Sequence, residues 1–394
     1  MIIWIKSGVR KDCYEGSFEI NLTGPVDVNN DCFVWESILM KSMFKSLIKS
    51  VLRIEARDTY HKQHGDQANG ILKTLESEFG RTNPNDIRLA EEYALDVYGD
   101  ICYAPWLRVY TAFAGEFREG WVPDNYYGRV VIPRIKGGYG RIGDLKSLTR
   151  IVFDSDAFPD VIYFVNGLFF STNFTLISRS DVSDFLFRKS ESVVFKLDNS
   201  LQGKGVFFID KSSFSIRDIE RLGNGVFQER IVQHPLFESF AKNSVATLRV
   251  TTVIDDSGLV SVRACYLRFG REGDTHVQSN SHVRVPISLN DGGFGDKAYL
   301  PNWLMVSEHP DSKMIFSGNK VPLFRECISM IIELHKRMPI VRCIGWDVSV
   351  DRSNVVRVME WNSWHNDIKF SEATQGPCFA DLGWSKFVRW NSSE

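Results

Sequence analysis

Two apolar segments near the C-terminus, each interrupted by a carboxylate, are the feature that most constrains the fold of this chain. They read Ile344-Gly345-Trp346-Asp347-Val348-Ser349-Val350 and Val355-Val356-Arg357-Val358-Met359-Glu360-Trp361-Asn362. Both are rich in β-branched and aromatic residues, which favours strands. Asp347 and Glu360 lie 13 residues apart, about the length of a hairpin, so we expect two adjacent strands.

The polar side chains of these two strands are suited to bind a cation. Because side chains alternate along a strand, Glu360 and Asn362 are expected on one face, which Val356 and Val358 share. A carboxylate that continues an apolar face is costly unless it is paired or bound to a metal. Asp347, Glu360 and Asn362 together offer the oxygen ligands that Mg²⁺ prefers. The alternative is a pair of surface carboxylates at strand ends.

An upstream segment combines a lysine with a glycine-rich loop. Residues 193–208 read Val-Val-Phe-Lys-Leu-Asp-Asn-Ser-Leu-Gln-Gly-Lys-Gly-Val-Phe-Phe. Lys196 would reach nucleotide phosphates from the face of its strand. Gly203, Lys204 and Gly205 would bend over those phosphates, because glycine adopts positive φ and lets backbone N–H groups approach closely. No P-loop pattern is present. The alternative is a β-hairpin with a glycine-rich turn and a snorkelling lysine.

A second strand-like segment ends in polar residues and a proline. Residues 226–235 read Val-Phe-Gln-Glu-Arg-Ile-Val-Gln-His-Pro. The backbone of such an extended segment, at Gln228, Glu229 and Ile231, can hydrogen-bond the edge of an adenine. Composition alone favours an ordinary edge strand.

Basic side chains within apolar segments form the last candidate group. Arg249 and Arg268 lie inside two predicted strands, and Lys146 lies in a short predicted helix that begins at Asp144. A guanidinium inside an apolar strand needs a partner, which bidentate contact with phosphate or carboxylate would supply. An internal salt bridge to Asp or Glu is the alternative.

The overall composition argues against several classes of protein. The 394 residues, 43% of them apolar, suit one large multi-lobed unit or two to three domains. A net charge of −2 provides no attraction to nucleic acid or to an anionic membrane. Seven scattered cysteines without a CxxC pair fit reduced thiols, so we expect a cytoplasmic protein without a zinc site. No apolar stretch of about 18 residues occurs, so we expect no transmembrane segment.

Periodicity along the chain predicts a mixture of helices and strands. A helix is predicted from Val34 to about Arg57, another over 86–98 with Asn85 as its N-cap and Gly99 as its end, and a third over 322–337. Strands separated by short helices favour α+β lobes over regular βα alternation. The predicted strands are 161–165, 193–197, 205–209, 226–231, 245–254 and 260–269.

The order of these elements resembles that of the ATP-grasp superfamily. The shared pattern is a helix lysine, a strand lysine, a glycine loop, a hinge strand, an acidic residue and then Glu-x-Asn. More narrowly, the chain resembles the sugar-transfer-associated ATP-grasp family, whose genes lie among polysaccharide biosynthesis genes. The narrower resemblance rests on residues 245–252, 266–270, Gly292-Gly293, His309-Pro310 and 344–347, and it covers roughly residues 100–390.

The resemblance implies an α+β ATP-grasp fold, in which two lobes grip ATP, with an N-terminal helical or pre-grasp region. On this basis we predict a mostly helical region over 1–105. A pre-grasp linker and the first part of the ATP-grasp fold would cover 106–190. The small lobe, with the strand lysine, glycine loop and hinge, would span 191–240, and the large lobe with the metal site would span 241–394.

The resemblance also implies an ATP-dependent carboxylate–amine ligase that uses ATP and Mg²⁺ and forms an amide through an acyl phosphate. The resemblance implies that Lys146 and Lys196 bind the α- and β-phosphates and that Gly203, Lys204 and Gly205 cover the β,γ region. It implies adenine binding by Gln228, Glu229 and Ile231, and Mg²⁺ binding by Asp347, Glu360 and Asn362. Arg249 or Arg268 would stabilise the acyl phosphate.

The implied substrates are a small-molecule or sugar-linked carboxylate and an amine, used in surface polysaccharide biosynthesis such as that of capsule or O-antigen. Peripheral contact with a membrane-bound glycan assembly system is part of this expectation. Two alternatives stay open: an ATP-dependent sugar kinase with the same phosphate and metal sites, and a non-catalytic nucleotide-binding protein. The intact set of Asp347, Glu360 and Asn362 argues against the last.

Overall fold

The computed structural model describes residues 31–200, 205–276 and 281–390, with the backbone alone for 31–54 and 388–390. The chain divides into two compact units, Met1–Asp58 and Thr59–Glu394. All of the candidate site residues fall within the bounds of the second unit. Two of them, Gly203 and Lys204, lie outside the described residues.

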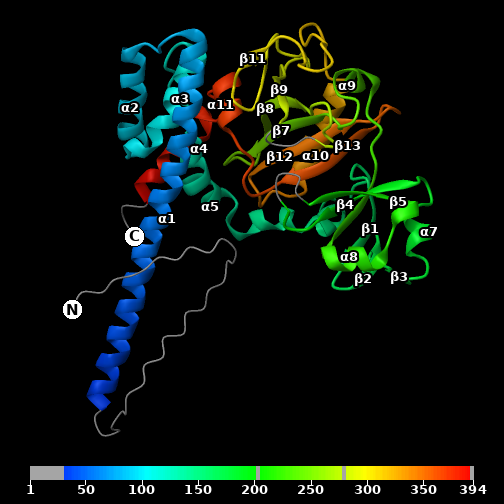
Figure 1. The fold of residues 1–394 in the computed structure, drawn as a ribbon. Coiled ribbons are helices and arrows are strands. Elements are labelled where there is room, and N and C mark those ends of the chain that lie inside the picture. The colour runs from blue at the N-terminus through cyan, green and yellow to red at the C-terminus, as the bar shows by residue number, and fades with distance from the viewer. Residues whose placement is uncertain (1–30, 201–204, 277–280, 391–394) are drawn as a thin grey trace. The chain divides into compact units, whose positions relative to one another are not determined.

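Among the described residues six α-helices precede residue 160, three lie between residues 180 and 241, and two follow residue 320 (Figure 1). No helix among the described residues is long and apolar enough to cross a bilayer. The bounds are α1 Asp31–Phe79, α2 Pro84–Tyr98, α3 Ala104–Ala114, α4 Asp124–Tyr126, α5 Ile132–Ile135, α6 Thr149–Phe153, α7 Val182–Leu186, α8 Ile216–Leu222, α9 Pro235–Phe240, α10 Phe324–Lys336 and α11 Lys369–Gln375.

The helix α2 begins at Pro84, two residues earlier than the sequence predicted. Asn83, not Asn85, is the N-cap, and its side chain accepts a hydrogen bond from the backbone N–H of Asn85. Pro84 occupies the first turn, where its missing N–H costs nothing because that donor would have no helical partner. Gly99 ends the helix in the left-handed conformation, as predicted.

A six-stranded antiparallel sheet forms the smaller of the two sheets. The side chains of Val193 and Phe195 on β4 enter an apolar cluster with residues of α7 and α8, such as Val182 and Ile219. Alternation along the strand therefore places Lys196 on the opposite face. In spatial order the strands are β3 Leu176–Ile177, β2 Leu168–Ser171, β1 Asp160–Val165, β6 Gly225–Glu229, β4 Ser192–Leu197 and β5 Val206–Asp210.

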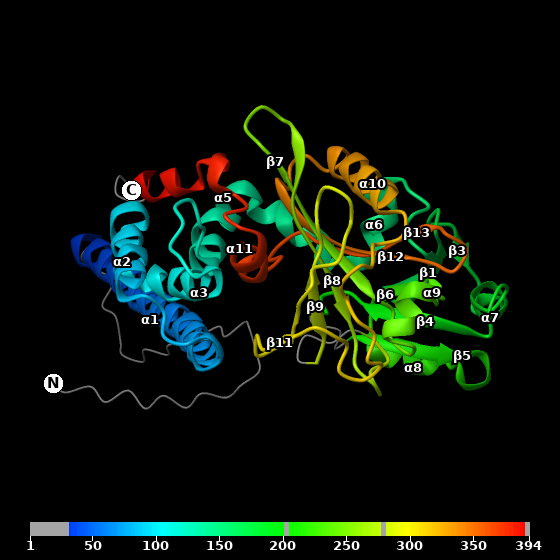
Figure 2. The same cartoon turned by 90° about the horizontal axis from the view of Figure 1, so that it is seen from above.

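A seven-stranded antiparallel sheet forms the larger one. The helix α10 packs on one of its faces, where it contacts β7, β8 and β12 around a large apolar core (Figure 2). The opposite face meets a second core that includes α3 and α11. In spatial order the strands are β11 Met305–Val306, β10 Ala298–Tyr299, β9 Val283–Pro286, β8 Val260–Phe269, β7 Thr247–Ile254, β12 Cys343–Val350 and β13 Val356–Asn362.

The pairing of β12 with β13 contains a register shift that the sequence did not predict. Asp347 lies opposite Glu360, whereas the next residue, Val348, lies opposite Val358, so Met359 has no partner in the ladder. This β-bulge reverses the alternation along β13. The expectation that Glu360 shares a face with Val356 and Val358 was wrong, because Trp361 joins those two valines in the core.

The predicted fold class is confirmed, since the second unit combines two antiparallel sheets with helices and the N-terminal region is helical. The strands at 160–165, 192–197, 206–210, 247–254 and 260–269 lie within two residues of their predicted bounds. The division of the chain at residues 105, 190 and 240 stays a prediction.

Candidate functional site

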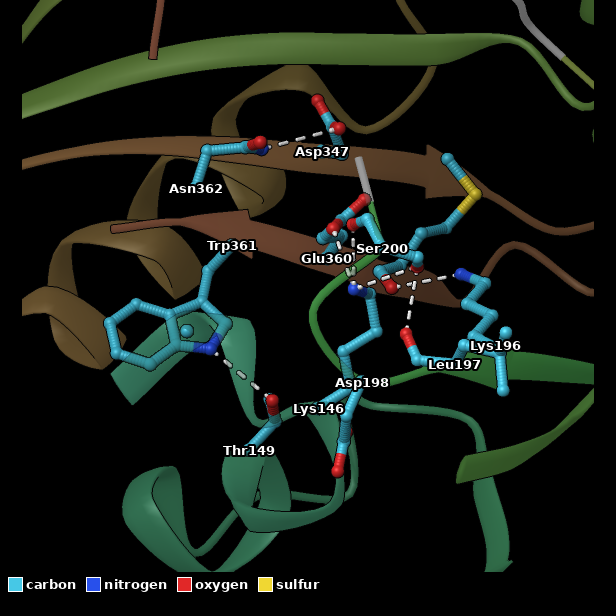
Figure 3. Close-up of polar contacts among 12 residues, drawn as sticks. Lys146, Thr149, Lys196, Leu197, Asp198, Ser200, Asp347, Glu360, Trp361 and Asn362 are labelled. Atoms are coloured by element: carbon cyan, nitrogen blue, oxygen red, sulfur yellow. Dashed lines mark hydrogen bonds and ion pairs between the residues drawn. The ribbon is translucent and has the colours of Figure 1, made fainter. Parts of the chain in front are cut away.

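Two lysines from different segments extend toward the strand that carries Glu360 (Figure 3). The Lys146 ammonium lies 3.6 Å from Glu360 Oε1 and donates to the backbone oxygen and the hydroxyl of Ser200 at 3.2 and 3.3 Å. Lys196, from β4, donates to the backbone oxygen of Met359 at 3.1 Å. The two sheets thus meet at Met359 and Glu360.

The bulge at Met359 explains why its carbonyl oxygen is available. A residue outside the ladder leaves its backbone groups without strand partners. Lys196 provides the hydrogen bond, so the two sheets are tied together by a cation and a carbonyl. The same bulge turns Glu360 away from the core and toward Lys146.

The segment that holds Lys146 is a 3₁₀ turn, Lys146–Leu148, where a helix from Asp144 was predicted. It is fixed on both sides. Asp198 accepts hydrogen bonds from the backbone N–H and the hydroxyl of Ser147 at 3.2 and 3.3 Å. Gly143 donates to the hydroxyl of Ser363 at 3.0 Å. Lys146 is therefore positioned by both the β4 end and the residue that follows β13.

These side chains border a small pocket with a volume of about 10 Å³. Apolar walls accompany the charged groups, and Trp361 Nε1 donates to Thr149 Oγ1 at 3.2 Å behind them. The lining residues are Gly143, Lys146, Thr149, Phe158, Lys196, Gln228, Met359, Glu360 and Trp361.

Asp347 belongs to a buried ion-pair cluster beside this pocket. Arg249 holds both of its oxygens, with Nε at 2.6 Å and Nη2 at 3.0 Å, and Arg268 Nη2 lies 2.7 Å from Oδ1. Asn362 Nδ2 donates to Oδ2 at 3.4 Å. Burial alone would raise the pKa of Asp347, but Arg249 and Arg268 outweigh it and hold the pKa at about 2.

Gly345 makes the bidentate contact sterically accessible. A Cβ at this position would lie 2.7 Å from Asn366 Cβ and 3.5 Å from Arg249 Cδ. The arginine side chain therefore passes over a residue with no side chain of its own to reach Asp347. Arg249 Nη1 also donates to the backbone oxygen of Asn366 at 3.4 Å.

Burial affects the titration of Lys196. Removal from water lowers its pKa from the ordinary value, and the nearby carboxylates of Glu360 and Asp160 offset part of this effect. Asp160 is buried too, and its pKa is raised by burial despite hydrogen bonds donated by Gln228 at 2.8 Å and Tyr163 at 3.1 Å. A half-buried ammonium whose direct contact is a single carbonyl is suited to receive an anion.

The three predicted adenine-binding residues are placed differently from one another. Gln228 lines the pocket through its side chain. Glu229 borders a separate groove and pairs with Lys189 at 2.9 Å, while its backbone N–H donates to Pro159. Ile231 follows the end of β6 and is half-buried. Their role toward adenine stays a prediction.

The described part of the glycine loop lies against Ser200. A Cβ at Gly205 would collide with the Ser200 side chain, which accepts from Lys146. Glycine at this position therefore leaves room for the Ser200 side chain that contacts Lys146. The other two loop residues of the prediction, Gly203 and Lys204, lie outside the described residues.

Several residues of the site were not found from the sequence. Ser200, Asp198 and Thr149 have no motif of their own and act through contacts that only the tertiary structure creates. Asp160 could have been noticed as a charged residue next to an apolar strand. Met359 carries no signal, since its role depends on the bulge and not on its side chain.

Asp347, Glu360 and Asn362 offer the oxygen atoms that Mg²⁺ prefers, but Asp347 is bound by two arginines and Glu360 faces Lys146. Among the described residues no group of three or more His, Cys, Asp or Glu side chains is placed to hold a metal ion. The predicted metal set consists instead of two carboxylates and one amide. Glu360 is the more accessible carboxylate, with 35% of its side chain exposed against 8% for Asp347. The roles of Asp347, Glu360 and Asn362 as metal ligands stay predictions.

Comparison with solved structures found distant similarity to several enzymes. The biotin carboxylase domain of a Hydrogenobacter thermophilus 2-oxoglutarate carboxylase is 12% identical over 64% of this chain and 46% of that chain, with a TM-score of 0.39. The ATP-grasp ligase PsnB is 12% identical over 65% and 63%, with a TM-score of 0.37. An L-amino acid ligase from Bacillus licheniformis is 11% identical over 63% and 48%, with a TM-score of 0.36.

In each case the match spans less than two thirds of the solved chain. No curated protein matches the sequence. A family model does match, and the matched region runs from the start of α8 to the residues after α11, so it includes β12, β13 and both arginines bound to Asp347. Residues 214–379 match the sugar-transfer associated ATP-grasp family, which confirms the resemblance predicted from the sequence.

Proposed function

We propose that this protein is an ATP-dependent carboxylate–amine ligase that modifies a sugar or an amino acid in surface polysaccharide biosynthesis. The observation that supports it most is the convergence of Lys146, Lys196 and Glu360 on one pocket where the two sheets meet. The family match supports the link to sugar transfer.

Within this proposal, Lys146 and Lys196 bind the phosphates of ATP and exchange their present partners for phosphate oxygens. Met359 and Phe158 line the pocket beside these lysines. Glu360, with Asn362 and Asp347 beside it, would hold Mg²⁺, which when bound would neutralise charge on the phosphates of ATP.

The reaction consists of two displacements. An oxygen of the substrate carboxylate forms a bond to the γ-phosphorus, and the bond from that phosphorus to the bridging oxygen of ADP breaks. The amine nitrogen then attacks the carbonyl carbon and loses a proton, and phosphate leaves. Arg249 and Arg268 lie beside Asp347, where they stabilise the negative charge of the acyl phosphate.

The test combines nucleotide binding with product analysis. ATP affinity is measured with and without Mg²⁺ for the wild type, for Glu360→Gln and for Glu238→Gln. Glu238 is a suitable control because it pairs with Arg352 at 2.6 Å and has a similarly exposed side chain, 33%. We expect the magnesium dependence to disappear in Glu360→Gln alone. Equal magnesium dependence in all three proteins would contradict the metal assignment.

Panels of carboxylates and amines are then screened for release of free phosphate from ATP. Amide, ADP and phosphate are the expected products of a ligase. A phosphorylated sugar with ADP and no free phosphate would instead establish the kinase alternative. ATP binding without turnover on any pair of substrates would favour a non-catalytic protein.

A further inference from the structure

Three arginines form a row on one face of the seven-stranded sheet. Arg249 on β7 lies opposite Asp347, Arg268 on β8 lies near it on the same face, and Arg284 on β9 lies directly opposite Arg268. All three are largely buried: 8% of the Arg249 side chain, 14% of the Arg268 side chain and 7% of Arg284 are exposed. The row begins at the proposed metal site and leads away from it.

The third arginine lacks the carboxylate that the other two share. Among the described residues, Arg284 has no acidic group within ion-pair distance. Its Nη2 donates to the backbone oxygen of Leu300 at 3.0 Å, and its guanidinium lies 4.3 Å from the ring centre of Phe370 and 5.2 Å from that of Trp303. The Nε groups of Arg268 and Arg284 have no acceptor in the described structure.

Such an arrangement is unfavourable without an anion. Like charges directly opposite each other on neighbouring strands repel, and burial weakens the screening by water. Burial lowers the pKa of Arg284, and the charge of Arg268 lowers it further. Asp367 acts in the opposite direction, but its carboxylate pairs with Lys369 at 3.0 Å. A buried pair of cations with free donors is the environment that a carboxylate would complete.

We propose that Arg268 and Arg284 form the subsite that binds the carboxylate of the acceptor substrate. This inference rests on the proposed ligase function and deepens it, because it names the residues that bind the group that receives the phosphate. Arg268 also contacts Asp347, so a carboxylate held here lies next to the residues proposed for magnesium. A hydroxyl acceptor, as in a kinase, would leave the excess positive charge uncompensated.

The first experiment needs no substitution. The Nε–H signals of arginine are followed by NMR in nitrogen-15-labelled wild-type protein while acetate is added, and acetamide serves as the neutral analogue. We expect the signals of Arg268 and Arg284 to shift with acetate and not with acetamide. Acetate is small enough to enter any carboxylate subsite, so equal responses to the two compounds would overturn the proposal.

The second experiment compares Arg284→Lys with Arg263→Lys. Arg263 is a matched control because it lies on β8, has a 15% exposed side chain, and pairs with Asp381 at 2.7 Å. Loss of the planar, two-donor contact should weaken acetate binding about tenfold or more in Arg284→Lys and leave it unchanged in Arg263→Lys. Equal affinities in the two variants would also overturn the proposal.

Magnesium ADP affinity distinguishes this inference from the proposed function. It should be the same in wild type, Arg284→Lys and Arg263→Lys, because neither arginine contacts the nucleotide pocket. If the nucleotide binds normally but acetate does not, the carboxylate subsite is wrong and the ATP site stands. If the wild type does not bind magnesium ADP, the proposed function itself fails.

Discussion

Asp347 and Glu360 lie directly opposite each other on β12 and β13, yet their carboxylates are held by different cations. Asp347 is bound by Arg249 and Arg268 within the sheet, whereas Glu360 faces Lys146 from the other side of the pocket. Each cation proposed to bind an anionic substrate group thus has a protein partner. Binding of magnesium ATP would require an exchange of partners and not merely the filling of an empty space.

The first prediction concerns the stability of the Asp347 cluster. Asp347→Asn leaves two buried guanidiniums without their shared counter-charge, so the free energy of unfolding should fall by about 3–5 kcal/mol. Urea unfolding at neutral pH measures this change. A loss below about 1 kcal/mol would mean that water reaches the cluster and screens it.

The same group predicts a pH dependence. The pKa of Asp347 in the folded protein is about 2, below its value of 3.8 in an unfolded chain. The stabilisation is therefore present above about pH 4 and is lost as the pH falls toward 2. Asp347→Asn should lack this component when unfolding is compared between pH 5 and pH 2.

The second prediction concerns Lys196. Lys196→Met removes a half-buried positive charge that donates to Met359, and the KM for ATP should rise about tenfold or more, because charged hydrogen bonds contribute about 1.5–3 kcal/mol. Lys189→Met, which alters an exposed pair with Glu229, is the control. An unchanged KM in Lys196→Met would remove this lysine from the phosphate site.

The third prediction concerns Glu372, a fully buried carboxyl group on α11. Burial raises its pKa from 4.5 to about 8, although backbone N–H groups of Val122 and Cys378 donate to it and lower the pKa in part. A raised pKa in the folded state means that stability is greatest below about pH 4.5 and is lost as the pH rises toward 8. Urea unfolding across this range should show the decline.

Glu372→Gln provides the control for that slope. The amide cannot ionise, so the decline between pH 4.5 and 8 should disappear. At low pH the variant should be less stable than the wild type by about 1–3 kcal/mol, since its NH₂ group faces a backbone donor. A decline that persists in the variant would assign the pH dependence to another group.

The fourth prediction concerns the glycine beneath Arg249. Gly345→Ala introduces a methyl group 2.7 Å from Asn366 Cβ, and overpacking of this kind costs about 1–3 kcal/mol. Gly138→Ala is the control, because a methyl group there meets nothing within 4 Å. Thermal unfolding of both variants measures the difference. Equal melting temperatures would show that Asn366 and Arg249 move aside without cost.

The strands and most helices could be predicted from the sequence because local periodicity determines them. β4 and β8 followed from apolar runs of the right length, and α2 from a cap at each end. The N-cap moved from Asn85 to Asn83 because proline is favoured in the first turn, and two asparagines close together give ambiguous signals. Single residues at helix ends are decided by small energy differences.

The partners within the site could not be predicted, because they come from distant segments. Arg249 and Asp347 are 98 residues apart, and the sequence showed only that each needs a partner. The internal salt bridge considered as an alternative for the two arginines is present, with Asp347 as the acid. Arg284 drew no notice, because one arginine in a short strand of four residues has no local signal.

The unpaired residue at position 359 makes the length of β13 as important as its composition. With an even alternation Glu360 would follow Val358 by two positions into the core, and Trp361 would turn outward. Deletion of Met359 would remove the bulge but keep Glu360 outside and Trp361 inside, because Glu360 would then directly follow Val358 in a regular ladder. When this segment is compared with that of related chains, a one-residue gap here should be read as loss of the free carbonyl that Lys196 contacts, and not as loss of the outward placement of Glu360.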